Sequence, residues 1–345
     1  MIIGHQKIID FLSRSIKTGR MAHAYLFAGP PKVGKKIVAF EFIKALLCQN
    51  AADGSGACER AERVSSHAER GGKCRNCLLI EQGRHPDVLF VVPGGESSKA
   101  AINGEKEEEQ VKNKEIKIGQ IRELQHQLNL TPFSATKKVI IIDEADKMTQ
   151  EAANCLLKTL EEPPQKSLLI LITSRPQALL ATIVSRCQLI KFLPVKENLI
   201  AEGLKKLGAG NDKKIKQAAR LSAGRPGAAV SLLNEDEAWQ RQEKLVDDLK
   251  YLIKKDFSER FRYAQKMAQN TPEAQEALGQ WLVWFRDQML AGVGAKNLTI
   301  LEEKSGLYPF SKICVLIKNI QETQRLLGES SFNARLILEN LLLKF

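Results

Sequence analysis

A glycine-rich segment between an apolar run and a helical pattern is the feature that most constrains this fold. It extends from Gly29 to Lys36 and matches the pattern G-x-x-x-x-G-K. The apolar run before it, residues 24–28, predicts a buried strand, and the periodicity over residues 37–48 predicts a helix. Between a strand and a helix, such glycines let backbone N–H groups surround phosphate oxygens, and the helix N-terminus favours negative charge. The sequence therefore predicts a phosphate-binding loop in an α/β fold.

The last position of this loop departs from what phosphoryl transfer needs. Loops that support hydrolysis carry Ser or Thr after the lysine, because that hydroxyl binds Mg²⁺. Here Lys35 is followed by Lys36, which has no acceptor for a metal ion while it is charged. We expect Gly29, Gly34, Lys35 and Lys36 either to bind phosphate or only to keep the shape of the loop, with poor hydrolysis.

Two carboxylates follow a later apolar run. Residues 139–142 read as a buried strand, and Asp143 and Glu144 come directly after it. Open α/β sheets place their ligand site at the carboxyl ends of the strands. In a working ATPase, Asp143 would hold Mg²⁺ and Glu144 would polarise the attacking water. The alternative is an acidic helix start, but the glycine-rich loop upstream favours a nucleotide-type site.

Four of the seven cysteines form a second candidate site. Cys48, Cys58, Cys74 and Cys77 offer four thiolates for a tetrahedral Zn²⁺ ion, and the last two have C-x-x-C spacing. Cys48 is alternatively a core residue at the end of a helix, which leaves three cysteines and His67 as ligands. We expect structural zinc here, because a polar insertion with few core residues needs a cross-link.

Strand patterns stop near residue 193. We expect an α/β domain over 1–193, with a Cys-rich insertion at 48–77 and a mobile polar insertion at 94–117. A small helical domain at 194–235 and a helical bundle at 236–345 follow. The patterns predict strands at 24–28, 88–92, 139–142, 167–173 and 189–192, and later helices at 119–129, 148–161, 177–184, 197–207, 212–222 and 226–234.

Net charge and hydropathy constrain the function and location of the protein less than the motifs do. Lys+Arg number 52 against 40 Asp+Glu, a net charge of +12, which suggests a polyanionic partner without distinguishing nucleic acid from an acidic protein. No stretch approaches the roughly 18 apolar residues of a membrane span. We expect a cytoplasmic protein with reduced cysteines and no membrane partner.

Together these motifs resemble the AAA+ clamp-loader family. The most specific are L-K-T-L-E-E-P-P at 157–164 and S-R-C at 185–187; the others lie at 23–27, 29–36, 85–87, 118–122, 143–144 and 224–227, with the cysteine cluster. The resemblance implies an AAA+ P-loop NTPase-type parallel-sheet domain, a helical lid and an all-α C-terminal bundle. It also implies a place in a five-membered ring that uses ATP to load a sliding clamp onto primer-template DNA. Implied partners are gamma/tau-like motor subunits and a clamp-opening delta-like subunit of a replicative DNA polymerase holoenzyme.

The resemblance also assigns roles to residues. Arg186 becomes an arginine finger that acts in trans on a neighbouring motor subunit's ATP. Thr173 and Ser174 end the strand in the sensor-1 region, and Arg225 lies in the sensor-2 segment. Lys36 favours a subunit without catalysis of its own, in which Glu144 is vestigial and ATP or ADP binding is weak or absent. The long interval between Cys58 and Cys74 departs from the family's compact zinc module and leaves the ligand set open.

Two other functions remain open at this stage. An active clamp-loader motor ATPase is motivated by the retained Lys35, Asp143 and Glu144. A zinc-dependent DNA-binding module is motivated by the positive charge and the C-x-x-C motif.

Overall fold

The described part of the chain forms two units. The computed structural model describes residues 2–48, 74–94, 115–208, 211–234, 236–294, 308–328 and 332–345. One unit comprises Met1–Gly208 with Ser222–Ala229, and the other comprises Ala209–Leu221 with Val230–Phe345. Cys58, most of the expected Cys-rich insertion and most of the expected polar insertion lie outside the described residues.

A five-stranded parallel sheet forms the centre of the first unit. Its order is β2-β3-β4-β1-β5, and every pair of neighbours is parallel. The central strands are buried on both faces, as expected of strands whose interiors are continuous apolar runs without alternation. Their bounds are β1 Ala24–Ala28, β2 Val88–Val91, β3 Lys138–Ile142, β4 Ser167–Thr173 and β5 Gln188–Lys191.

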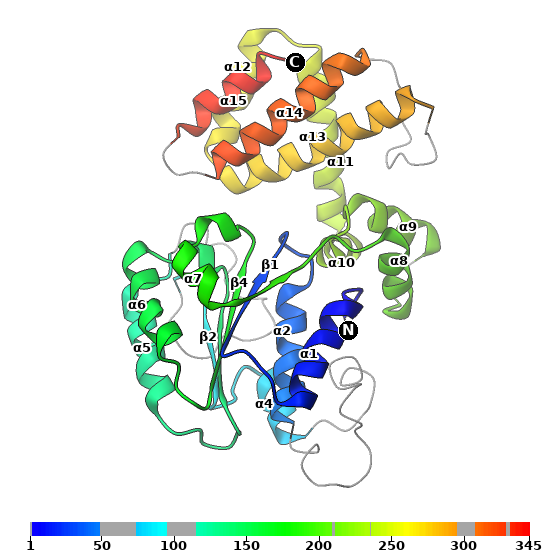
Figure 1. Ribbon diagram of the computed structural model, residues 1–345. Helices are drawn as coiled ribbons and strands as arrows, with labels where there is room; N and C mark the ends of the chain where they lie inside the picture. Colours follow the sequence, from blue (N-terminus) through cyan, green and yellow to red (C-terminus); the bar gives the residue numbers. More distant parts are fainter. Residues whose placement is uncertain are drawn as a thin grey trace. The chain divides into compact units, whose positions relative to one another are not determined.

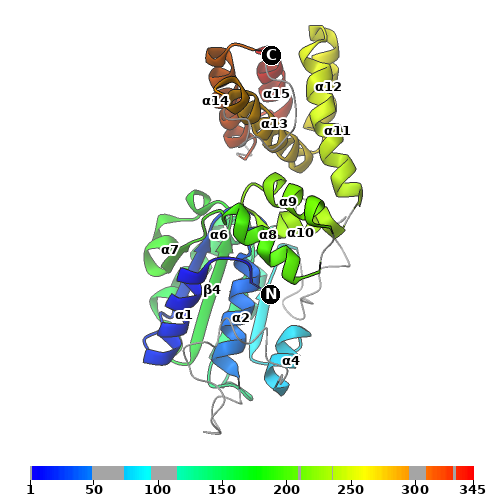
Figure 2. The ribbon, with the colours of Figure 1, turned by 90° about the vertical axis from the view of Figure 1, so that its right-hand side faces the viewer.

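Helices cover both faces of this sheet (Figures 1 and 2). One face carries α1 Gln6–Thr18, α2 Lys35–Leu47 and α4 Arg75–Glu81, and the other carries α5 Ile118–Asn129 and α6 Gln150–Glu161. Successive strand residues enter opposite cores. Tyr25 and Phe27 pack with α2, whereas Ala24 and Leu26 belong to the cluster that includes α5 and α6. The α/β architecture expected from the sequence is therefore present.

The helix expected at 177–184 is divided. A short turn, η3 Pro176–Ala178, is followed by α7 Ala181–Arg186, which packs beside α6. Leu179 between them has extended backbone and is buried in the core. This break moves the helix toward the C-terminus, so that Arg186 is its last residue.

All described elements after β5 are helices. The second unit has an aromatic core around Trp281, Trp284, Phe285 and Phe345. Among the described residues, none of the helices has the length and apolarity that crossing a membrane requires. The bounds are α8 Glu197–Lys206, α9 Asp212–Leu221, α10 Pro226–Asn234, α11 Asp236–Ile253, α12 Phe257–Ala268, α13 Thr271–Gly292, α14 Phe310–Leu327 and α15 Ala334–Leu342.

Candidate nucleotide-type site and cysteine cluster

The loops that follow β1, β3 and β4 meet at one edge of the sheet. Since all strands are parallel, their carboxyl ends point the same way and bring these loops together. They enclose a cavity of about 300 Å³ whose lining includes residues from each of the three loops. The predicted residues in this lining are Gly34, Lys35, Lys36, Asp143, Glu144 and Ser174.

The glycine-rich loop depends on glycine at two positions. Gly34 has φ 108°, a left-handed conformation that a side chain would strain, and α2 starts directly after it. Gly29 lies so close to the backbone of Phe192 that there is no room for a Cβ atom. The structure thus has the expected order of strand, loop and helix. Glycine at these two positions allows the left-handed backbone of the loop and its close contact with Phe192.

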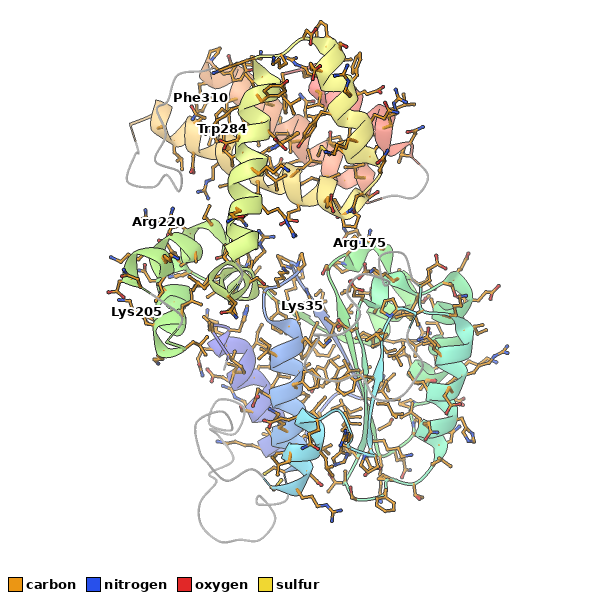
Figure 3. The ribbon with its side chains drawn as sticks, turned by 180° about the vertical axis from the view of Figure 1, so that it is seen from behind. Lys35, Arg175, Lys205, Arg220, Trp284 and Phe310 are labelled. Carbon is orange, nitrogen blue, oxygen red and sulfur yellow. The ribbon has the colours of Figure 1, made fainter. Side chains whose placement is uncertain are left out.

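Lys35 is folded back onto its own loop. Its Nζ donates to the carbonyl oxygens of Gly29 at 2.6 Å and Pro30 at 2.7 Å, and to Ser174 Oγ at 3.3 Å. The side chain stands at the start of α2 (Figure 3) and is buried. Burial lowers the pKa of Lys35 to about 8, although the carboxylates of Asp143 and two further acidic residues act in the opposite direction. A bound phosphate would have to draw this ammonium group away from acceptors that it already has.

Lys36 places a second cation on the carboxylate that would bind magnesium. Its Nζ lies 3.2 Å from Asp143 Oδ2, and both side chains are partly exposed. Glu144 is paired with Lys147 at 2.9 Å and has φ 48°. Both acidic residues singled out from the sequence are thus already engaged by lysines.

Sequence reasoning missed a polar network beside this cavity. Thr173 Oγ1 donates to Asp146 Oδ1 at 2.6 Å, and Arg175 Nε donates to Asp146 Oδ2 at 2.9 Å. Asp146 and Thr173 are nearly inaccessible to solvent in their side chains, so the network fixes the end of β4 relative to the segment after β3. The signal in the sequence was a polar residue, Thr173, ending an apolar strand.

Arg225 lies near the loop without lining the cavity described above. Its Nε donates to the carbonyl oxygen of Ser222 at 3.0 Å. The neighbouring Gly227 does line the cavity, and its N–H donates to the carbonyl oxygen of Lys32 at 2.9 Å. A side chain at Gly227 would collide with that carbonyl, which explains a glycine here.

Arg186 is partly exposed and held by an ion pair. Its Nη2 lies 2.8 Å from Glu161 Oε1, and Nη1 donates to the carbonyl oxygen of Thr182 at 3.1 Å. The guanidinium group therefore has a defined direction at the end of α7. The adjacent Cys187 has its pKa raised to about 12 by burial, as expected of a thiol packed in a core.

Three of the four predicted zinc ligands come together. Cys48 follows α2, Cys74 precedes α4 and Cys77 lies on α4, and their Sγ atoms are all within 4.8 Å of one another. Zn–S bonds of about 2.3 Å in a tetrahedron place sulfur atoms about 3.8 Å apart, so this spacing fits a zinc ion. Burial raises the pKa of the Cys77 thiol, which a bound cation would reverse. Cys58 lies outside the described residues.

Polar contacts between α2 and α4 hold these cysteines in place. Lys44 Nζ on α2 lies 2.9 Å from Glu41 and 2.8 Å from Glu81 on α4. The buried Asn76, between two of the cysteines, donates from Nδ2 to the carbonyl oxygen of Leu47 at 3.0 Å. The cluster thus belongs to an ordered junction between two helices.

Comparison with known proteins decides the family. A family profile described as "DNA polymerase III, delta subunit" matches residues 4–196. A DNA polymerase III subunit delta' of Pseudomonas aeruginosa is 30% identical over 94% of this chain and 92% of its own length. The chain belongs to the DNA polymerase III delta' subunit family. As a delta' family member, it is a clamp-loader subunit of DNA replication.

The residues that the family profile matches lie within the sheet unit. The Bacillus subtilis delta' subunit is 37% identical over 57% of this chain, a match that spans half of that relative's length. The DNA polymerase III subunit tau of the same species is 26% identical over 84% of this chain and 49% of its own length. This delta' family member is therefore also related to tau.

Proposed function

We propose that this clamp-loader subunit helps to place the sliding clamp on primed DNA without hydrolysing ATP itself. In this proposal it supplies Arg186 in trans to the nucleotide of a neighbouring gamma/tau-like motor subunit. A clamp-opening delta-like subunit, the sliding clamp and primer-template DNA are its further partners through the assembled ring. The observation that carries the non-hydrolysing role is the ion pair between Lys36 and Asp143.

Metal-assisted phosphoryl transfer needs Mg²⁺ beside the phosphates, held by a loop hydroxyl and a strand-end carboxylate. This chain has no hydroxyl at position 36, and the Lys36 ammonium is 3.2 Å from the carboxylate of Asp143. Mg²⁺ and the Lys36 ammonium group repel each other, so Mg²⁺ would have to displace Lys36 from Asp143 before it could bind there. With Lys35 also engaged by carbonyl oxygens, we infer that ATP or ADP binds weakly or not at all.

Arg186 can change partners at little cost. Its ion pair with Glu161 is partly exposed, and exposed pairs contribute only about 0–1 kcal/mol. A triphosphate offers a stronger match to the planar guanidinium fork than a single carboxylate does. In this proposal Glu161 orients the arginine in the free subunit and releases it to the neighbour's nucleotide in the ring.

The test is the DNA-stimulated ATPase activity of the reconstituted complex. Arg186→Ala should leave assembly intact and lower that activity, because hydrolysis at the neighbouring motor site should fall by about 10³-fold or more when its arginine finger is lost. Glu161→Ala removes the ion pair but keeps the arginine, and should retain most activity. Arg262→Ala, which removes another exposed, ion-paired arginine, is the matched control. Wild-type ATPase activity in the Arg186→Ala complex would refute the finger role.

We further propose structural zinc, held by Cys48, Cys74 and Cys77 with Cys58 as fourth ligand. The compact sulfur cluster and its fit to a tetrahedral ion support this proposal. Bound zinc would cross-link the helix junction and leave no open position for catalysis.

A further inference from the structure

Two thiols of the cysteine cluster lie close together at the start of α4. Cys74 is the N-cap residue of this helix, and Cys77 is its third residue. Their Sγ atoms are 3.4 Å apart. The sulfur–sulfur bond of a disulfide is about 2.05 Å long, so the two atoms would have to approach each other by roughly 1.4 Å. We call Cys74 and Cys77 together the α4 thiol pair.

The backbone at Cys74 allows this approach without unwinding α4. Cys74 has ψ 165° and an extended backbone, so it stands outside the regular helix. Its carbonyl oxygen accepts the N–H of Leu78 at 3.1 Å, a helical bond that does not involve the side chain. Cys74 is 8% exposed and Cys77 is 1% exposed. An oxidant therefore reaches Cys74 first, and the second thiol lies beside it.

Cys48, the third described member of the cluster, comes from a different helix. It follows α2, which packs against α4 (Figure 2). A hydrogen bond from Asn76 and an ion pair of Lys44 hold the two helices together. A disulfide to Cys48 would require a movement between these helices, which both contacts oppose. A disulfide within the α4 thiol pair requires no such movement.

We propose that the α4 thiol pair is a redox-active site, which a disulfide oxidant such as glutathione disulfide converts into a disulfide within α4. The Cys74 thiolate attacks one sulfur of the oxidant, forms a mixed disulfide and releases one glutathione thiolate. The Cys77 thiolate then attacks Cys74 Sγ, and the second glutathione thiolate leaves. Two electrons pass from the α4 thiol pair to the oxidant, and the two departing thiolates take up two protons.

Oxidation would also release the metal and loosen α4 from α2. This consequence rests on the proposed structural zinc, because zinc binds cysteine as a thiolate and a disulfide offers none. The new bond lies within α4, so it does not replace the link to Cys48 that zinc would make. Disulfides in reducing compartments are usually transient and often sense redox state. The cluster would therefore switch reversibly between a zinc-linked and a disulfide form.

The test treats the purified full chain with glutathione disulfide, before and after a chelator has removed metal. Mass spectrometry maps each disulfide, and a chromogenic chelator measures the zinc released. We expect a disulfide between Cys74 and Cys77 in both samples, with about one equivalent of zinc released from the untreated chain. The partly exposed Cys48 should keep its thiol and become open to alkylation. A dithiol reductant should restore both thiols and zinc binding.

Three variants assign the reaction to these residues. Cys48→Ser should still form the disulfide, because that residue takes no part in it. Cys77→Ser should stop at a glutathione adduct on Cys74, because no second thiol displaces the glutathione. Cys155→Ser, which alters a partly buried cysteine outside the cluster, is the matched control and should react as the wild type does.

The outcomes separate the redox site from the zinc proposal. A purified chain without zinc would refute the structural metal, while disulfide mapping in the metal-free chain still tests the α4 thiol pair. A disulfide that joins either residue of the pair to Cys48 or Cys58 would overturn the redox proposal. The proposal would also fail if both thiols of the metal-free chain stayed reduced under conditions that modify Cys155.

Discussion

At the scale of single residues, two adjacent lysines occupy the groups of the nucleotide-type loop that would otherwise face a phosphate or a metal ion. Lys35 satisfies carbonyl oxygens of its own loop, and Lys36 neutralises Asp143. Both contacts keep the loop closed without a phosphate. Sequence alone showed that position 36 lacks a hydroxyl. Which carboxylate its ammonium group contacts depends on the strand order, in which β4 pairs with both β3 and β1.

Replacing Lys36 tests this account directly. Lys36→Thr removes the ammonium group from Asp143 and adds the hydroxyl that Mg²⁺ needs, so Mg²⁺-dependent binding of a fluorescent ATP analogue should tighten about tenfold, or 1.4 kcal/mol. Lys36→Met removes the charge without adding a ligand, and should gain less. The wild-type chain alone should show no turnover of Mg·ATP. Turnover that Lys35→Ala abolishes would instead favour the active motor ATPase.

At the scale of elements, hydrophobic patterning predicted strands better than helix ends. β1 and β4 have the predicted bounds, because buried parallel strands are continuous apolar runs limited by polar or glycine residues. The pattern failed at 177–184, where the burial of Leu179 breaks the helix. Local periodicity does not contain that information, since the burial depends on packing against other elements.

The cysteine cluster was only partly predictable at this scale. The C-x-x-C spacing indicated Cys74 and Cys77, but the contribution of Cys48 depends on how α2 and α4 pack. The ion pair of Lys44 with Glu81 and the hydrogen bond of Asn76 hold that packing. Neither contact had a signal in the sequence.

Removing metal should loosen α4. The purified chain should contain about one equivalent of zinc, and a chelator should raise amide hydrogen exchange in α4 at least about tenfold, because metal binding and folding are coupled. Cys77→Ser should reproduce this effect. Cys155→Ser, which alters a partly buried cysteine outside the cluster, should not. Less than about half an equivalent of metal, together with amide hydrogen exchange in α4 that the chelator leaves unchanged, would mean that these cysteines are core residues and not zinc ligands.

At the scale of the whole molecule, the chain combines a sheet unit with a helical unit that has its own aromatic core. The division into domains at 1–193, 194–235 and 236–345, with the last for ring assembly, stays a proposal. The net charge of +12 is not concentrated in the candidate site, where lysines and carboxylates are paired. It includes exposed basic residues elsewhere, such as Lys214 and Lys216 on α9.

This distribution of charge predicts how tightly the chain alone binds DNA. A single subunit contacts few phosphates at once, so primed DNA should bind with a dissociation constant of roughly 10⁻⁴ to 10⁻⁶ M at physiological salt. Binding should weaken further at higher salt, because the release of condensed counterions then contributes less free energy. The assembled ring should bind more tightly, because several subunits contribute contacts to one duplex. A fluorescence anisotropy titration at three salt concentrations, with and without a zinc chelator, measures both effects. Nanomolar binding by the chain alone that the chelator abolishes would support the zinc-dependent DNA-binding module. Weak DNA binding that the chelator leaves unchanged would support a role for these basic residues in DNA binding only as part of the assembled ring.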